Sequence, residues 1–433
     1  MYQLIRFTTF LVISILFTKS HLTRYDIGLF EAFMFIAGFV SFFWVTGVIQ
    51  SFLSLVHNNK TFLRKSSMNG EKSPEIFNVF ILLTGFSLLV FLIGFGIRDS
   101  FRVFDVSGRG PYFSLLLAYI LLSNPSVLIE YIYLVRNQST RIMGYGLLTH
   151  GIQLFIVTFP VLKGYDIIWA LYAMVAISAV RFIWLLVLIY KYAQWNISWT
   201  FIKEHMSLGL PLIISALLSG SAQYIDGLVV TSRLNADYFA IFRYGAKELP
   251  LTLILATGLS NAMISEIGKV GNLKNSMDTI RHQSRRLIHF LFPISMFIML
   301  FARWLYPVMF NQDFLRSADV FMMYLLLIIP RLVFPQTILI GLKKTRVIMF
   351  ASFMEIILNV ILSIILIQYY GTVGVALATA IVYILEKAYL IGYNYYVLKI
   401  RPRNYIPVKT YLVYTFLIVL EFVLIDHRVI NIY

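Results

Sequence analysis

The chain has 433 residues, of which 59% are hydrophobic and only 13% are charged, and its mean hydropathy is +0.80. A soluble domain carries about a quarter charged residues, so this composition excludes a soluble globular protein. Without cysteine there are no disulfides, thiolate catalysis or cysteine metal sites, and the seven histidines show no metal-binding spacing. The formal net charge of +16 is typical of basic loops at a membrane, so we expect no nucleic acid partner.

Apolar segments recur in blocks of about 20 residues, the length that crosses hydrocarbon as an α-helix. Barrel strands would be shorter and would alternate with polar residues, which the run from Phe77 to Gly94 excludes. The first segment is expected to be a retained span, because no small-residue cleavage site follows it. The pattern predicts an all-α polytopic membrane protein with spans at 2–19, 28–56, 77–97, 111–135, 142–162, 167–190, 206–232, 245–268, 286–310, 318–342, 347–369, 372–398 and 409–426.

Lysine and arginine in the loops predict the orientation of these thirteen spans. If the N-terminus is cytoplasmic, the inside loops hold twenty of these residues and the outside loops hold ten. Positive residues favour the cytoplasmic side. We therefore expect a cytoplasmic N-terminus and, after a thirteenth span, a C-terminus outside.

A weak internal repeat indicates how the spans are grouped. The segment Leu22–Glu31 precedes the second span, and the similar segment Leu234–Arg243 holds the matching place before the eighth, an offset of 243 − 31 = 212 residues. Two six-helix bundles related by a pseudo-two-fold axis along the membrane normal would explain this offset, as in some secondary transporters. We expect one lobe at 1–200, a second at 201–400, and an additional C-terminal helix and tail at 401–433.

Charged residues inside predicted spans are candidates for functional sites, because a charge in hydrocarbon is costly. Arg331 is the strongest candidate, since Pro330 and Pro335 are expected to kink its helix. A guanidinium at such a bend suits a phosphate, because arginine offers a planar fork of donors. The alternative is a structural pairing with a buried acid or a freed carbonyl.

Other basic residues also lie within predicted spans, among them Arg6, Arg181 and Lys387. Arg6, near the cytoplasmic end of the first span, is favoured as a site residue over a snorkelling one. Arg181 and Lys387 are expected to snorkel or to pair locally, and Lys387 follows an acidic residue, Glu386.

The seventh span carries a polar stripe. Ser219, Gln223 and Asp226 share one helix face at i, i+4 and i+7, and such a stripe must face a cavity or a partner helix. Asp226 either binds a coupling cation or proton, or balances the charge of Arg243 or Lys247.

A set of short motifs is spread along the chain, at Tyr25–Gly28, Phe42–Gln50, Gly209–Leu212, Ile225–Gly227, Phe242–Leu251 and Gly371–Thr379. These motifs resemble those of polysaccharide flippases in the O-antigen and lipopolysaccharide branch of the multidrug/oligosaccharidyl-lipid/polysaccharide exporter superfamily. The resemblance extends over nearly the whole chain.

This resemblance implies two six-helix lobes, a V-shaped cavity and alternating access. The implied cargo is an undecaprenyl-pyrophosphate-linked oligosaccharide, moved to the outer leaflet of the bacterial inner membrane by a monomer coupled to Na⁺ or H⁺, without a cofactor or bound metal. Membrane lipids, a polysaccharide polymerase and glycosyltransferases are the implied partners. Carried over by position, the cavity residues are Arg6, Glu31, Gln50, Asp226, Arg243, Lys247 and Glu248.

Two alternative functions remain beside that of a lipid-linked sugar flippase. A cation-coupled multidrug exporter of the same fold is disfavoured because the first span lacks the acidic residue that many such relatives use. An O-antigen polymerase or ligase is disfavoured because the longest outward loop, Arg98–Gly110, is short and holds no histidine. The odd number of spans departs from the family's usual twelve or fourteen. The sequence therefore predicts a transporter and not an enzyme.

Overall fold

The computed structural model describes residues 2–58, 72–103, 106–107, 111–247, 250–267, 273–342 and 344–427. Some side chains inside the helices are not described, among them those of 218–223 and 264–266. The described residues are overwhelmingly helical. Beside the helices there is one small antiparallel hairpin, formed by β1 (Arg102–Val103) and β2 (Val106–Ser107). The predicted all-α class is confirmed.

The chain divides into two compact units, and the division falls inside one helix, α9 (Trp199–Arg233). Unit 1 comprises Met1–Tyr224 with Leu234–Asp237, and unit 2 comprises Ile225–Arg233 with Tyr238–Tyr433. The predicted boundaries at 200 and 400, and the symmetry between two six-helix bundles, stay predictions.

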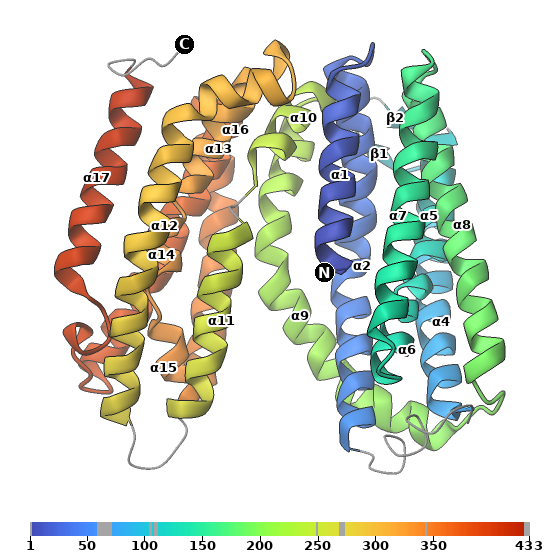
Figure 1. The fold of residues 1–433 in the computed structure, drawn as a ribbon, viewed down its shortest axis with the longest axis horizontal. Helices are drawn as coiled ribbons and strands as arrows, with labels where there is room; N and C mark the ends of the chain where they lie inside the picture. The colour runs from blue at the N-terminus through green and yellow to red at the C-terminus, as the bar shows by residue number, and fades with distance from the viewer. Residues whose placement is uncertain are drawn as a thin grey trace. The chain divides into compact units, whose positions relative to one another are not determined.

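Unit 1 is built from α1 to α8 and the first part of α9 (Figure 1). Its aliphatic and aromatic core includes Trp44, Val48 and Phe52 of α2, packed with Leu83 of α4 and Leu185 of α8. The helices are α1 (Tyr2–Thr18), α2 (Arg24–Asn58), α4 (Pro74–Ile97), α5 (Pro111–Ser126), α6 (Leu128–Val135), α7 (Ser139–Leu162) and α8 (Ile167–Tyr192).

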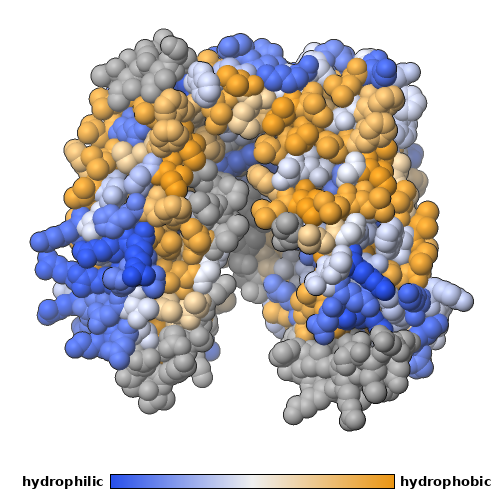
Figure 2. All heavy atoms as spheres, viewed as in Figure 1, coloured by the Kyte–Doolittle hydropathy of each residue, from blue (hydrophilic) through white to orange (hydrophobic). Residues whose placement is uncertain are grey.

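Unit 2 holds the remaining helices. They are α10 (Ala236–Gly245), α11 (Pro250–Ile267), α12 (Leu273–Met309), the 3-10 turn η1 (Gln312–Phe314), α13 (Leu315–Leu325), α14 (Ile328–Arg331), α15 (Pro335–Gly341), α16 (Thr345–Tyr396), the 3-10 turn η2 (Pro402–Asn404) and α17 (Val408–Asp426). Figure 2 shows hydrophilic side chains gathered over the first half of α12, where Lys274, Arg281, Arg285 and Arg286 are exposed. In the orientation predicted from the sequence, these four basic residues lie on the cytoplasmic side of the membrane.

Helix occupies most of each predicted span, but the number that cross a membrane stays a prediction. Among the described residues, eight helices are long and apolar enough to cross, and α1 is a shorter apolar helix of 17 residues. A ninth span results if the pair Gln312–Arg331 and Pro335–Gly341, bent by 46°, counts as one. The bend lies between Pro330 and Pro335, as the sequence predicted, because each proline removes a helix hydrogen bond.

The helix α16 contains a sharp internal reversal. A straight helix of its 52 residues would be about 78 Å long, far more than a bilayer needs. Gly371 has non-helical dihedral angles, with φ +57° and ψ −137°, and lies between the two spans predicted at 347–369 and 372–398. A Cβ atom on Gly374 would lie 2.2 Å from the Leu366 carbonyl oxygen, so the two arms leave no room for a side chain beside the turn.

Close helix packing also requires a glycine in unit 1. A Cβ atom on Gly47 of α2 would lie 2.6 Å from the backbone nitrogen of Ile213 in α9. Small residues allow membrane helices to approach closely, since van der Waals packing drives their association.

Replacing this glycine tests the α2–α9 contact. We expect Gly47→Ala to destabilise the protein by about 1–3 kcal/mol, because the α9 backbone cannot yield as a flexible side chain would. The matched control is Gly85→Ala in α4, where no atom lies within 4 Å of the new Cβ. Thermal unfolding in detergent measures both variants, and equal midpoints would contradict the close contact.

The predicted orientation is testable with single cysteines, because the chain has none of its own. An impermeant thiol reagent applied to intact cells should label Ser100→Cys and should leave Ser67→Cys unlabelled. Ser67 lies outside the described residues, and Ser100 is exposed at the end of α4. Labelling of Ser67→Cys alone would reverse the assigned orientation.

Candidate functional site

A cavity of about 810 Å³ lies within unit 1. Its walls come from α1, α2, α5, α6, α7, α8 and the unit 1 part of α9. The lining mixes aromatic and aliphatic side chains with hydroxyl, amide and guanidinium groups, which is the usual character of a site for an organic ligand.

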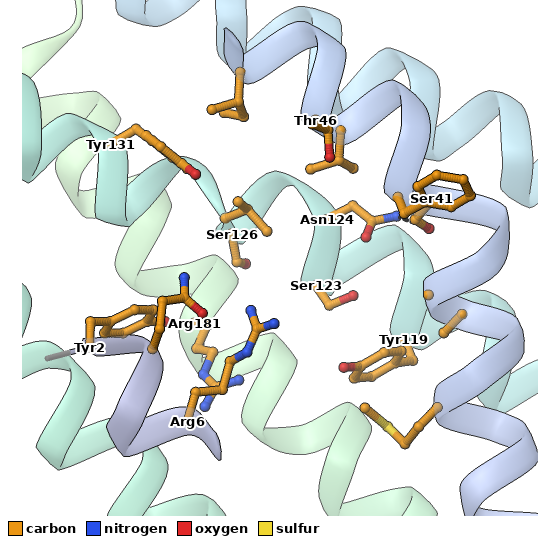
Figure 3. Close-up of a pocket in the computed structure, with 18 of the residues that line it drawn as sticks. Tyr2, Arg6, Ser41, Thr46, Tyr119, Ser123, Asn124, Ser126, Tyr131 and Arg181 are labelled. Atoms are coloured by element: carbon orange, nitrogen blue, oxygen red, sulfur yellow. Dashed lines mark hydrogen bonds between the residues drawn. The ribbon is translucent and has the colours of Figure 1, made fainter. Parts of the chain in front are cut away.

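Two arginines define the electrostatics of this cavity. Arg6 of α1 and Arg181 of α8 both line it, and Figure 3 shows their side chains lying next to each other. Neither arginine forms a salt bridge with a carboxylate in the described part of the chain, although Glu130 of α6 interacts electrostatically with Arg6. Two guanidinium groups beside one carboxylate leave a net positive charge, which suits an anionic ligand, because arginine is always charged and charge is costly in hydrocarbon.

The acceptors that hold Arg181 are neutral and come from α7. Its Nη2 donates to Oε1 of Gln153 at 2.7 Å and to Nδ1 of His150 at 3.1 Å. Both partners are almost fully buried, at 0% and 1% exposure. Arg181 is therefore fixed in place without losing its charge.

Polar groups of α5 face the two arginines. Figure 3 shows Tyr119 and Ser123 on the wall opposite Arg6 and Arg181. Further along, Asn124 donates to the hydroxyl of Ser41 in α2 at 2.8 Å, which ties two walls together. Hydroxyl groups beside a cationic pair suit a ligand with phosphate and sugar oxygens.

The structure brings together some of the predicted cavity residues. Arg6 and Gln50 both line the cavity in unit 1, whereas Glu31 is half-buried on α2 and does not line it. Glu248 lies outside the described residues, as do the side chains of Ser219 and Gln223 within α9. The roles predicted for these residues stay predictions.

Asp226 lies in unit 2, at the centre of a buried polar cluster, and is 4% exposed. Its carboxylate accepts hydrogen bonds from Tyr324 Oη at 2.5 Å, Thr379 Oγ1 at 2.6 Å and Asn359 Nδ2 at 3.1 Å. Ser363 extends the cluster by donating to Asn359 Oδ1 at 2.9 Å.

The reversal at Gly371 explains how this cluster forms. Asn359 precedes the reversal and Thr379 follows it, so the two arms of α16 each contribute one group. All three neighbours donate hydrogen bonds to the Asp226 carboxylate, one of them through nitrogen, so the cluster stabilises a buried negative charge.

Arg331 lies at the break between α14 and α15, but its surroundings combine an aromatic ring with mixed charges. Its guanidinium lies 5.0 Å from the centre of the Tyr383 ring. Arg331 and Lys387 both act electrostatically on Glu355, as does Glu386. The local pairing predicted for Lys387 is confirmed, since its Nζ lies 2.9 Å from Oε2 of Glu386, and it also donates to Gln336.

The two cations at the end of α10 are half-buried in unit 2. Arg243 lies in the last turn of α10, and Lys247 follows the helix with its Nζ 5.1 Å from the centre of the Tyr244 ring. Neither Arg243, Lys247 nor Arg331 lines the unit 1 cavity. Their predicted contact with cargo stays a prediction.

Sequence reasoning missed Arg181, which it expected to snorkel or to pair locally. The signal was present in part: His150 and Gln153 are polar residues at i and i+3 inside an apolar helix, and so lie on one face. What the sequence could not show is that α8 packs against this face of α7.

The sequence of the chain matches that of one known protein family. A family model described as polysaccharide biosynthesis protein matches residues 21–319. No curated protein sequence matches the chain.

Several solved structures share the fold. The lipid II flippase MurJ in an inward closed conformation has a TM-score of 0.69 at 17% identity, covering 100% of this chain and 93% of that chain. An inward-facing multidrug resistance MATE family transporter of the MOP superfamily has a TM-score of 0.61 at 14% identity, covering 88% and 92%. A MOP superfamily transporter from Pyrococcus furiosus, described by a binding pocket of reverse polarity that suggests a different function, has a TM-score of 0.55 at 14% identity, covering 90% and 91%.

At these identities the structural likeness establishes the fold alone, while the family model covers more than half of the chain. The chain therefore belongs to the polysaccharide biosynthesis protein family and has the fold of MurJ and of the MATE transporters of the MOP superfamily.

Proposed function

We propose that this protein moves an undecaprenyl-pyrophosphate-linked oligosaccharide from the cytoplasmic to the outer leaflet of the bacterial inner membrane by alternating access. The product would serve polysaccharide or lipopolysaccharide synthesis, and the polymerase and glycosyltransferases of that synthesis are the proposed partners. The observation that carries the proposal is the pair formed by Arg6 and Arg181 in one cavity, without a salt bridge to the described carboxylates.

The charge of the cargo explains why such a pair is useful. A pyrophosphate must leave water and lipid head groups in order to cross, and it loses their solvation. Charge-assisted hydrogen bonds from guanidinium groups replace that solvation and strengthen where water is scarce. The adjacent Tyr119 and Ser123 hydroxyls add donors for phosphate or sugar oxygens.

The lining of the cavity also weighs against a multidrug exporter, which remains the alternative because MATE transporters share the fold. A cavity for cationic drugs would present acids. The described residues that line the unit 1 cavity include two arginines and no aspartate or glutamate. An O-antigen polymerase or ligase is less well supported, since the structural neighbours are transporters.

Asp226 supplies the proposed coupling site. The carboxylate of Asp226 accepts hydrogen bonds from the Tyr324 and Thr379 hydroxyls and from the Asn359 amide nitrogen, and protonation or a bound Na⁺ would neutralise its charge, which is buried in a helix bundle. Arg243, Lys247 and Arg331 are retained as proposed contacts of the head group in unit 2.

Removing the cationic pair tests the cargo. Arg6→Gln and Arg181→Gln should each lower transport of the lipid-linked sugar about tenfold or more, because a hydrogen bond to a charged group contributes about 1.5–3 kcal/mol. The assay follows a labelled lipid-linked oligosaccharide in reconstituted vesicles as it becomes accessible to an impermeant reagent. Arg346→Gln, an exposed arginine at the start of α16, is the matched control. Normal transport by both cavity variants would remove the cationic site from the mechanism.

Replacing the buried carboxylate tests the coupling. Asp226→Asn removes the charge with little change in shape, so transport should fall and lose its dependence on a sodium or pH gradient. Asp278→Asn, on the exposed face of α12, should leave both unchanged. The same vesicle assay with imposed gradients measures this, and full activity with an unaltered ion dependence would assign Asp226 a structural role.

A further inference from the structure

The fixed state of Arg181 depends on two acceptors that converge on a single nitrogen. Arg181 Nη2 carries two hydrogens, and Gln153 Oε1 and His150 Nδ1 accept one each, at 2.7 and 3.1 Å. These two acceptor atoms lie only 3.2 Å apart, so the shared donor between them relieves their mutual repulsion. Both acceptors therefore face Nη2, whereas Nη1 forms no hydrogen bond with the residues that the structure describes and the buried Nε has no partner among them.

The orientation of the Gln153 amide is itself determined. Its Nε2 lies 3.5 Å from the sulfur of Met174, an acceptor only, so the nitrogen points to the sulfur and the oxygen points to Arg181. The side chain is 0% exposed and has no room to turn toward water. A neutral oxygen is therefore presented to the guanidinium from the interior of the α7–α8 contact.

The tautomer of His150 sets the direction of both hydrogen bonds at its Nδ1. With the proton on Nε2, Nδ1 accepts from Arg181; with the proton on Nδ1, that atom donates to Gln153 Oε1 instead. Because arginine has no acceptor, we take the first, neutral tautomer. The ring of Tyr2, from α1, lies 5.5 Å from the histidine ring and covers it. A second proton on His150 would place two cations 3.1 Å apart, which the buried site disfavours.

We propose that Gln153 and His150 are positioning residues, which hold Arg181 through Nη2 without a neutralising carboxylate, so that its charge remains available to a diphosphate in the cavity that it lines. The inference rests on the proposed function of that cavity. The choice of neutral acceptors is the essential feature. A carboxylate at position 153 would hold the guanidinium at least as firmly, but it would cancel the charge that the ligand needs.

Substitutions at position 153 can separate two effects on Arg181: whether its guanidinium is held in place, and whether its charge is neutralised. Gln153→Glu keeps the shape and adds a charge beside Arg181, whereas Gln153→Met keeps neutrality and removes the acceptor. Farnesyl pyrophosphate serves as the probe, titrated by calorimetry into the purified full-length protein in detergent. The thermal midpoint of each variant is measured alongside.

We expect Gln153→Glu to lower affinity for farnesyl pyrophosphate at least about tenfold, while its thermal midpoint stays the same or rises. Gln153→Met should lower both affinity and midpoint, since it leaves Nη2 with one acceptor. If Gln153 had only a structural role, Gln153→Glu would preserve both the affinity for farnesyl pyrophosphate and the thermal midpoint.

Gln138→Glu is the matched control. Gln138 Oε1 accepts from Nη1 of Arg141 at 3.1 Å, so the same substitution beside another arginine is made away from the cavity lining. Its affinity for the probe should equal that of the wild type. Equal losses for Gln138→Glu and Gln153→Glu would overturn the inference, because the effect would then be one of overall charge.

Different outcomes would contradict the proposed function of the cavity and the positioning role of Gln153. If the wild type does not bind farnesyl pyrophosphate, the cavity is not a diphosphate site, and both the proposed function and the inference are wrong. If the wild type binds and both Gln153 variants bind equally well, only the positioning role is wrong. Should Gln153→Glu not fold, undiminished affinity of Gln153→Met would overturn the inference alone.

Discussion

The cost of uncompensated positive charge in a membrane helix bundle is the constraint on which this structure depends. An arginine at the centre of a membrane helix is disfavoured by about 2.5–3.5 kcal/mol. Arg181 lies in the middle of α8, and Arg6, near the start of α1, adds a second positive charge to the same cavity. The bundle tolerates them because α7 offers neutral acceptors to Arg181, and α5 offers Tyr119 and Ser123 beside the pair. An anionic ligand would relieve the remaining electrostatic cost, which is why the cavity suits such a ligand.

The parts of the fold set by local backbone chemistry could be predicted from the sequence. The reversal at Gly371 lies between two spans that hydropathy predicted, and the break between Pro330 and Pro335 lies where the two prolines predicted a kink. The helical spans followed from the length of apolar runs, because every backbone polar group in hydrocarbon must be satisfied within the helix.

The parts of the site that depend on pairing between distant helices could not be predicted. Arg181 contacts a residue 28 positions earlier, and the partners of Asp226 lie 98, 133 and 153 positions later in the chain. Periodicity places a polar residue on a helix face but does not identify the helix opposite that face. Arg331 was the strongest candidate because its helix is broken; the sequence did not show its ring contact with Tyr383 or its charged neighbours, and its contact with cargo stays a prediction.

One helix belongs to both of the proposed sites. Tyr224 of α9 lines the cavity in unit 1, and Asp226, two residues later, lies in the polar cluster of unit 2. Residues two apart point to different faces of a helix, so neither side chain belongs to both sites.

The central claim is that the unit 1 cavity binds the diphosphate of a lipid carrier, and site-specific photocrosslinking tests it most directly. A benzophenone amino acid at Phe7, which lines the cavity, should crosslink to a radiolabelled undecaprenyl-pyrophosphate-linked sugar in membranes. The same group at Phe155, an exposed hydrophobic residue of α7 outside the lining, reports contact with bulk lipid. The account predicts crosslinking at Phe7 that excess undecaprenyl pyrophosphate suppresses and undecaprenol does not. Equal suppression by undecaprenol, or crosslinking no stronger than at Phe155, would contradict it.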